Sequence, residues 1–196
     1  KSIGNACEDI KTNVLGSLNV IELSIKNKVK KFIFSSSGGA IYEDTKNRPT
    51  TEENSEYPLS PYGISKLTID KYLNYYHKIF GLHFVSLRYA NVYGPRQNSK
   101  GEFGVVAIFI DRMLSGEAPI VNGSGKTIRD YVFIDDVIKA NILALDCFEK
   151  EGIFNIGTGV ETNLLKLLKI INSHFGKNKL KKIHIPMKVK EQKNSC

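Results

Sequence analysis

The feature that most constrains the fold of this chain is the regular alternation of short apolar runs with longer amphipathic segments. The short runs predict strands at Lys30–Ser37, His83–Val92, Ile120–Val121, Tyr131–Ile134 and Gly152–Gly157. The longer segments predict helices at Glu8–Lys26, Pro61–Gly81, Val105–Ser115, Asp135–Phe148 and Thr162–Phe175. Strands that alternate with helices indicate a parallel sheet, because parallel strands need long crossover connections. We therefore predict an α/β fold with a parallel sheet.

Residues at the helix ends support these boundaries. Pro61 is favoured in a first helical turn, and Asp135 is suited to cap a helix N-terminus. Gly81 and Gly176 follow predicted helices and are suited to C-terminal caps. Stretches rich in polar residues, proline and glycine predict loops at Tyr42–Ser60 and Tyr93–Gly104.

Composition argues against several classes of protein. A chain of 196 residues that is 41% hydrophobic can bury an ordinary core. Its apolar runs are far shorter than the ~20 residues that cross a bilayer, so we expect no membrane contact and a cytoplasmic location. The cysteines, Cys7, Cys147 and Cys196, are odd in number and widely spaced, which fits no disulfide framework. The four histidines show no metal-ligand spacing, so no metal is predicted.

The formal net charge of +8 is concentrated at the end of the chain. Residues 176–196 contain seven lysines and one acid, which leaves +2 for residues 1–175. Lysine outnumbers arginine 23 to 5, whereas phosphate and guanine recognition favours the arginine fork. We therefore expect no nucleic-acid partner and interpret the end as a solvated, lysine-rich tail.

The residues with the clearest chemical potential are Tyr62 and Lys66 in the motif YGISK. A spacing of four places both on one face of the predicted helix. An ammonium there would stabilise phenolate and lower the tyrosine pKa from its usual value of ~10, which would make Tyr62 a general base near neutral pH. Such pairs are common on helix surfaces, but here a strand that ends in serines precedes the pair. Hydroxyls at the carboxyl end of a parallel strand are placed to bind the same substrate oxygen.

With these residues assembled, the chain resembles the extended short-chain dehydrogenase/reductase family, in its UDP-glucose 4-epimerase-like branch. Six ordered motifs carry the resemblance: TNVLGSLNV (Thr12–Val20), KKFIFSSSGGAIY (Lys30–Tyr42), SPYGISK (Ser60–Lys66), LRYANVYGPRQ (Leu87–Gln97), GVVAIF (Gly104–Phe109) and RDYVFIDDV (Arg129–Val137). The resemblance implies a Rossmann-like NAD-binding domain with helices on both faces of its sheet, of which residues 1–92 are the C-terminal part. It also implies a small interleaved nucleotide-sugar-binding subdomain in residues 93–196, with residues 131–157 returning to the Rossmann-like domain.

The same resemblance implies roles for individual residues. Tyr62 would be the base, Lys66 its electrostatic partner, and Ser37 or Ser36 the hydroxyl that orients the substrate. The residues implied in NAD binding are Asn13, Ser35, Tyr62, Lys66 and Tyr89. Those implied in substrate binding are Ser37, Asn91, Val105, Val106 and Arg129. Asn13 would support Lys66, unless it is only a buried polar residue, and Arg129 would hold the nucleotide diphosphate, unless it pairs with Asp130 or Asp135.

The activity implied by the resemblance is epimerisation at C4 of a UDP-sugar of the UDP-glucose/UDP-galactose type. The base would take the proton of the 4-hydroxyl while NAD accepts hydride from C4, and hydride would then return to the other face of the 4-keto sugar. Related dehydratases and decarboxylases carry an acid just after the strand-end serine or threonine, where this chain has Gly38 and Gly39. The alternatives are a dehydratase or reductase of the same family, and a non-catalytic fragment or assembly partner.

The chain departs from the family pattern at both ends. The Gly-rich dinucleotide fingerprint is missing, since Gly157–Gly159 (GTG) has no third glycine and no acid about 20 residues on, and is better interpreted as a packing turn. We therefore expect a chain that lacks the N-terminal strands of the fold. No arginine follows Pro186, so the loop that closes on the diphosphate is expected to be absent or replaced. Relatives pair through their two long helices, which predicts a homodimer through Glu8–Lys26 and Pro61–Gly81.

Overall fold

The fold is organised around a parallel sheet of three strands. The computed structural model describes residues 4–42, 44, 48–100, 104–147, 150–175, 182–186 and 194–196. The sheet contains β1 (Phe32–Ser37), β2 (Phe84–Tyr89) and β7 (Gly152–Ile156), in the order β1-β2-β7. Both pairs are parallel, and Ser36 of β1 lies beside Arg88 of β2. The carboxyl ends of the three strands therefore meet at one edge of the sheet.

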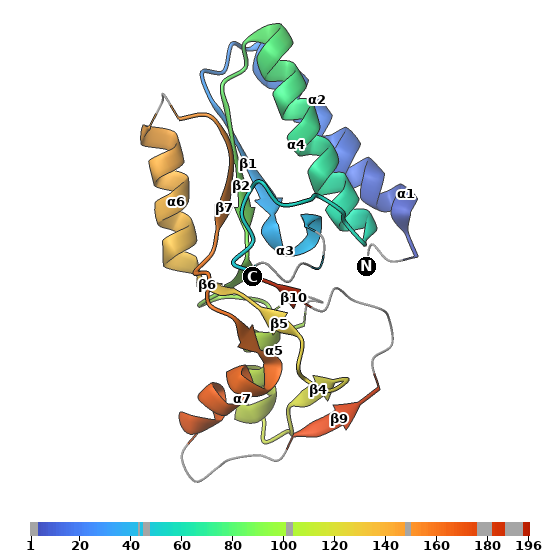
Figure 1. The fold of residues 1–196 in the computed structure, drawn as a ribbon, viewed down its shortest axis with the longest axis vertical. Coiled ribbons are helices and arrows are strands. Elements are labelled where there is room, and N and C mark those ends of the chain that lie inside the picture. The colour runs from blue at the N-terminus through green and yellow to red at the C-terminus, as the bar shows by residue number, and fades with distance from the viewer. Residues whose placement is uncertain are drawn as a thin grey trace.

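Helices cover both faces of this sheet, as predicted (Figure 1). One face carries a continuous helical segment made of α1 (Ala6–Asp9), the π-helical stretch η1 (Ile10–Leu15) and α2 (Gly16–Lys26), beside α4 (Pro61–Phe80). The other face carries α6 (Ile134–Asp146). Residues of β2 alternate between the faces, because Phe84 belongs to the core with α2 and α4, whereas Val85 and Leu87 pack with Ala144 of α6. The sheet is thus buried on both faces, as parallel sheets usually are.

A second, smaller lobe lies beyond the carboxyl ends of the strands (Figure 1). It contains α5 (Val105–Leu114), α7 (Leu164–Ser173), β4 (Ile120–Asn122), β5 (Ile128–Arg129), β8 (Thr162–Asn163), β9 (Ile183–Ile185) and β10 (Asn194–Ser195). Its core joins Phe109 and Met113 of α5 to Leu168 and Ile171 of α7, around Val121 of β4. The parallel strands β3 (Asn91–Tyr93) and β6 (Tyr131–Phe133) lie where the two lobes meet (Figure 1).

Several predicted boundaries were wrong, for local reasons. The predicted strand His83–Val92 is divided, because β2 ends at Tyr89 and β3 leaves the central sheet to pair with β6. Asp135 does not cap α6, since that helix begins at Ile134 and Phe133 occupies the cap position. A short helix, α3 (Gly38–Ile41), follows β1 directly. Four residues that include two glycines show no helical period, so the sequence did not predict it.

The ends of α4 match the prediction. Pro61 lies in its first turn, and the Ser60 hydroxyl accepts a hydrogen bond from the backbone N–H of Gly63 at 3.1 Å. At the other end Gly81 adopts a left-handed conformation with φ of 68°, as a C-terminal cap requires. The corresponding residue after α7, Gly176, lies outside the described residues.

The part of the lysine-rich tail that the structure describes is paired with the second lobe. Residues of β9 pair with β4, and residues of β10 pair with β5. Ser195 is only 7% exposed, so the interpretation of this end as a solvated, lysine-rich tail is wrong at β10. Within the described ranges, no helix combines the length and apolar character needed to span a membrane.

Candidate functional site

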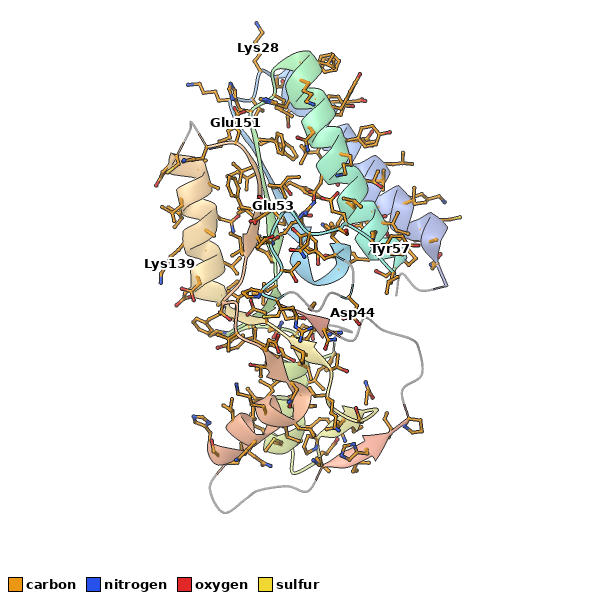
Figure 2. The ribbon with its side chains drawn as sticks, viewed as in Figure 1. Lys28, Asp44, Glu53, Tyr57, Lys139 and Glu151 are labelled. Carbon is orange, nitrogen blue, oxygen red and sulfur yellow. The ribbon has the colours of Figure 1, made fainter. Side chains whose placement is uncertain are left out.

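Tyr62 and Lys66 lie in the first turns of α4, beside the carboxyl end of β1. The opposite end of the sheet is marked by Lys28, before β1, and Glu151, before β7 (Figure 2). Tyr57, which precedes α4, lies far from that end (Figure 2). The pair thus occupies the edge at which parallel α/β sheets usually bind ligands.

Gly63, between the two residues, allows α4 to approach α3 closely. A Cβ atom on Gly63 would lie 2.2 Å from the carbonyl oxygen of Ala40 and 2.9 Å from Cβ of Pro58. Such contacts are far shorter than packed atoms tolerate, so a side chain here would push the two helices apart. The glycine therefore helps to set the position of Tyr62 relative to the end of β1.

The three serines at the end of β1 have different surroundings. A side-chain hydrogen bond joins Ser37 to Tyr62. The Ser36 hydroxyl, which is 3% exposed, instead donates to Oδ2 of Asp70 at 3.2 Å. The hydroxyl of Ser35 is exposed and lies 3.4 Å from Oη of Tyr89. Of the two candidates for orienting a substrate, only Ser37 is brought to Tyr62.

The ammonium group of Lys66 is directed at the same strand. Its Nζ donates a hydrogen bond to the carbonyl oxygen of Ser35 at 2.9 Å. Nζ also lies 4.8 Å from the ring centroid of Phe34 and 5.6 Å from that of Tyr62, at distances where an aromatic ring attracts a cation. The structure therefore brings Ser35, Ser37, Tyr62 and Lys66 together, and we call these four residues the open cluster.

The predicted acidity of Tyr62 is wrong for this chain. Burial raises the pKa of Tyr62, the hydrogen bond with Ser37 opposes this only in part, and the charge of Asp9 raises the pKa further. Burial also lowers the pKa of Lys66, against the attraction of Asp70 and Asp9. Both groups are therefore pushed towards their neutral forms, as happens when titratable groups lose water. The spacing of four residues places the Lys66 ammonium near the Tyr62 ring, but its hydrogen bond goes to the backbone carbonyl of Ser35.

Asn13 is connected to α4 less directly than predicted. Its Nδ2 donates to Oδ1 of Asp9 at 3.0 Å, and Oδ2 of Asp9 accepts from the Ser65 hydroxyl at 2.6 Å. The connection to α4 thus passes through Asp9 and Ser65. Because the charge of Asp9 raises the pKa of Lys66, the carboxylate that Asn13 binds links Asn13 to that lysine.

Tyr89 and Asn91 flank the point where the chain leaves the central sheet. The amide Nδ2 of Asn141, in α6, donates to Oη of Tyr89 at 2.8 Å. The amide Nδ2 of Asn91 donates to the backbone carbonyl of Asp130 at 3.2 Å. Tyr89 is thereby joined to the open cluster through Ser35, whereas Asn91 is tied to the second lobe.

The other predicted substrate residues belong to the second lobe. Val105 and Val106 open α5 and pack against the core of that lobe. Nη1 of Arg129 donates to the carbonyl oxygen of Ile128 at 2.8 Å, and its charge opposes the rise that burial causes in the pKa of Tyr131. These residues lie across the junction from the open cluster.

The GTG turn is a packing turn, as the sequence suggested. The Asp130 carboxylate accepts hydrogen bonds from the backbone N–H groups of Thr158, at 2.7 Å, and Gly159, at 2.9 Å. A Cβ atom on Gly157 would lie 2.3 Å from Oδ2 of Asp130. The backbone N–H groups of Thr158 and Gly159 thus bind the carboxylate of Asp130. In a dinucleotide-binding turn, such donors would bind a phosphate instead.

A comparison with known proteins identifies the family. A model of the NAD dependent epimerase/dehydratase family matches residues 1–157 of this chain.

The chain belongs to the NAD-dependent epimerase/dehydratase family.

Individual relatives agree with this assignment. A crystal structure of UDP-glucose 4-epimerase from Thermotoga maritima, with UDP-glucose, is 46% identical with a TM-score of 0.94, and the match covers 99% of this chain and 62% of that one. The Thermus thermophilus UDP-glucose 4-epimerase in complex with NAD is 37% identical with a TM-score of 0.90, covering 99% and 63%. A dTDP-4-dehydro-6-deoxyglucose reductase of Escherichia coli is 35% identical, covering 90% and 55%. The chain therefore spans less than two thirds of each relative.

The residues of the open cluster fit one end of the cofactor for which the family is named. An ammonium, a phenolic hydroxyl and an exposed serine hydroxyl stand side by side at the end of β1, which suits the hydroxyl groups of a ribose. The GTG turn, by contrast, does not fit a pyrophosphate, because Asp130 would repel it. Within the described ranges, no group of three or more metal-ligating side chains is placed to hold a metal ion.

A second polar cluster, which was not predicted from the sequence, is formed by Tyr42, Glu56, Asp70 and Arg88. Arg88 is 1% exposed and Asp70 is fully buried, and their side chains are 2.8 Å apart. A signal was present in the sequence, because Arg88 stands between Leu87 and Tyr89 in a strand predicted for a parallel sheet, where most side chains are buried. A buried guanidinium requires a partner, so this arginine could have indicated an acid on a neighbouring element. We call these four residues the closed cluster.

A cavity of about 170 Å³ lies where the sheet, α3 and the C-terminal segment meet. Residues at the ends of all three central strands, or just beyond them, contribute to its lining, together with Asp130 and Ser195. Such a hollow at the carboxyl edge of an α/β sheet is the usual place for a small-molecule ligand. Its main lining residues are Gly38, Gly39, Arg88, Asp130, Ile156 and Ser195.

Proposed function

We propose that the complete protein catalyses NAD-dependent epimerisation at C4 of a UDP-sugar of the UDP-glucose/UDP-galactose type. The observation that carries this proposal is the contact of Tyr62 with Ser37, with Lys66 one turn further along α4 and bound to the same strand. The likeness to UDP-glucose 4-epimerases, at 46% and 37% identity, supports it.

Each residue of the open cluster has a distinct part in the proposed reaction. Tyr62 takes the proton of the sugar 4-hydroxyl and returns it to the same oxygen, and Ser37 orients that oxygen by a hydrogen bond. Lys66 supplies positive charge beside the tyrosine and, with Ser35 and Tyr89, binds the ribose of the cofactor. Bound NAD supplies a reversible hydride acceptor. A raised Tyr62 pKa favours the step that returns the proton, and the Ser37 hydrogen bond eases the step that removes it.

The second lobe would bind the nucleotide part of the substrate. We assign Asn91, Val105, Val106 and Arg129 to this task because the family resemblance implies it and because they lie on elements of that lobe or at its edge. Arg129 would bind the diphosphate, which suits a bidentate donor. Asn13 would act on Lys66 through Asp9.

Dehydration and reduction are the rival reactions, and the first is disfavoured by Gly38 and Gly39. A Cβ atom on Gly38 would lie 3.1 Å from the carbonyl oxygen of Arg88, so this position has little room for a side chain. Gly39 has more room, since its nearest neighbours are 3.7 Å away, but it carries no acid. Elimination needs an acid or base here, whereas epimerisation needs only the tyrosine and a hydride acceptor.

The direct test is to incubate the complete protein, supplied with NAD, with UDP-galactose and, separately, with UDP-glucose. Epimerisation predicts that both reactions reach the same mixture, with no net reduction of NAD. Loss of water from the sugar would establish a dehydratase instead, and consumption of reduced cofactor would establish a reductase.

A non-catalytic role is the second rival, and NAD binding discriminates it. Equilibrium dialysis of the complete protein against labelled NAD measures whether it binds the cofactor. Our proposal requires binding by the complete protein, which Lys66→Met should weaken. An absence of NAD binding by the complete protein would favour an assembly role.

We also propose a homodimer through α2 and α4. Both helices expose large apolar side chains, which soluble proteins usually cover: Val20, Leu23, Ile64, Tyr75, Ile79 and Phe80. Leu23→Glu combined with Ile79→Glu should convert the dimer to a monomer in sedimentation experiments. Leu143→Glu, on the exposed face of α6, is the matched control and should leave the mass unchanged.

A further inference from the structure

Asp70 connects the open and closed clusters. It lies on α4 one turn beyond Lys66 and is fully buried. Its carboxylate accepts hydrogen bonds from the Ser36 hydroxyl at 3.2 Å, the Ser86 hydroxyl at 2.6 Å and Nε of Arg88 at 2.8 Å. These donors come from both strands on which α4 packs, so this single side chain fixes the helix to β1 and β2.

Arg88 extends the connection to the loop that covers the sheet. Its Nη1 donates to the Tyr42 hydroxyl at 2.7 Å, and its Nη2 donates to Oε1 of Glu56 at 2.5 Å. The Tyr42 hydroxyl in turn donates to Oδ1 of Asn155, in β7, at 2.8 Å. All three central strands and the loop before α4 are therefore held by one hydrogen-bonded group with fixed angles.

Stability alone does not account for such a group. A buried ion pair costs much desolvation energy, and well-packed apolar residues of similar volume are often as stabilising or more so. The planar guanidinium of Arg88 fixes the positions and angles of the groups that it binds, and the buried carboxylate of Asp70 supplies a negative charge. Both matter to Lys66, which shares a helix face with Asp70 at a spacing of four residues.

The charges around Lys66 give Asp70 an electrostatic effect as well. Within the described part of the chain, the charged or titratable groups that act on or contact Lys66 are Asp9 of α1, Asp70 of α4 and the phenol of Tyr62. Burial lowers the pKa of Lys66. The negative charges of Asp70 and Asp9 oppose this change, and Asp70 has the larger effect. Arg88 is bound to Asp70 and partly neutralises the negative charge that Asp70 presents to Lys66.

We propose that Asp70 is a positioning residue for the open cluster, which holds α4 at the depth that places Lys66 on the Ser35 carbonyl and keeps Lys66 cationic. This inference rests on the proposed function for its importance to catalysis. Its physical content, which is an effect of the Asp70 charge on the Lys66 amine, does not depend on turnover.

The test measures that amine directly. The complete protein, without substrate, is treated at fixed alkaline pH with trace acetic anhydride, which labels only neutral amines, and acetylation of Lys66 is quantified by mass spectrometry. Lys169, exposed on α7 and away from the proposed dimer helices, is the internal reference. Asp70→Asn should increase labelling of Lys66 relative to Lys169 on the order of threefold, because a neighbouring negative charge is lost.

The matched variants separate charge from loosening of the structure. Arg88→Met should decrease labelling of Lys66, because the carboxylate of Asp70 is no longer neutralised by the arginine. Ser86→Ala removes a hydrogen bond to Asp70 without changing any charge and should leave labelling unchanged. If a single variant does not fold, the combined Asp70→Asn and Arg88→Met variant, which leaves neither member of this pair as a lone charge, should still label faster than the unmodified protein.

Labelling that changes in the same direction in Asp70→Asn and Arg88→Met, or that rises in Ser86→Ala, would overturn the proposal. These results are independent of the proposed function. If Tyr62→Phe retained turnover while Lys66 labelling followed the predicted signs, the proposed reaction would be wrong and the positioning role would stand.

Discussion

The open and closed clusters share helix α4, from which the open cluster reaches β1 and the closed cluster reaches β2, but they use their charges in opposite ways. In the closed cluster, Arg88 is bound by Asp70, Glu56 and Tyr42, and each of these partners lies within 2.8 Å. In the open cluster, Lys66 is bound to a neutral carbonyl. Burial lowers the pKa of Lys66 and raises that of Tyr62, so both groups are shifted towards their neutral forms. Burial also raises the pKa values of Asp70 and Tyr42 in the closed cluster, but there the charge and hydrogen bonds of Arg88 oppose the rise. The clusters therefore differ in how their charges are paired, not in whether burial shifts their pKa values.

The difference indicates which cluster serves structure and which serves chemistry. Titratable groups at the carboxyl edge of a parallel sheet, beside an exposed residue with a hydroxyl group such as Ser35, are typical of functional sites. A saturated cluster of hydrogen-bonded charges is typical of a structural element, although it is strongly sensitive to the loss of one member. We therefore expect substitutions in the closed cluster to reduce stability, and substitutions in the open cluster to affect function.

The largest effect on stability is expected for Arg88→Met. This change leaves Asp70 buried without its arginine partner, so the free energy of unfolding should fall by about 3 to 5 kcal/mol, measured by urea denaturation. Arg112→Met, which removes a partly exposed arginine paired with Glu117, should cost no more than about 1 kcal/mol. If the two variants lost equal stability, the distinction between a buried cluster and a surface pair would fail.

The next effect concerns Gly63, on which the junction of α3 and α4 depends. Gly63→Ala should reduce the free energy of unfolding by about 1 to 3 kcal/mol, because its Cβ would meet the Ala40 carbonyl oxygen. The same substitution at Gly16, whose added Cβ would have its nearest neighbour at 3.7 Å, should instead stabilise its helix by about 0.5 to 1 kcal/mol. A stabilising Gly63→Ala would show that the helices do not need this close approach.

The smallest effect is a gain of stability in Lys66→Met. Because the pKa of Lys66 falls on folding, the folded chain binds this proton more weakly than the unfolded chain, and protonation at neutral pH opposes folding. The opposition is complete below the lowered pKa and disappears as the pH rises towards the ordinary lysine range. Lys66→Met should therefore raise the thermal midpoint at pH 7, and the gain should shrink near pH 10. Lys78→Met should change the midpoint at neither pH, and a loss of stability in Lys66→Met at pH 7 would contradict this account.

The sequence predicted the elements whose signals are local. Pro61 and Gly81 marked the two ends of α4, and the structure has Pro61 in its first turn and Gly81 at its C-terminal cap. The contact of Tyr62 with Ser37 could be predicted because the carboxyl end of a parallel strand and the start of the next crossover helix meet at one edge of the sheet.

Features that depend on distant contacts could not be predicted in this way. The direction of the Tyr62 pKa depends on burial and on Asp9, neither of which appears in a spacing of four residues. The division of the strand near Ala90 depends on the pairing of β3 with β6, 40 residues later in the chain. The GTG turn was interpreted correctly only because its pattern was incomplete, and its binding to Asp130 became evident from the structure.

The most direct test of the central claim compares Tyr62→Phe with Tyr72→Phe in the complete protein. Tyr72 lies on the same helix but is 39% exposed, so it controls for the substitution itself. We predict that Tyr62→Phe lowers kcat for UDP-galactose by about 10²- to 10⁴-fold, with little change in stability, and that Tyr72→Phe leaves kcat within about threefold. Near-normal turnover by Tyr62→Phe would show that the open cluster is not the site of the reaction.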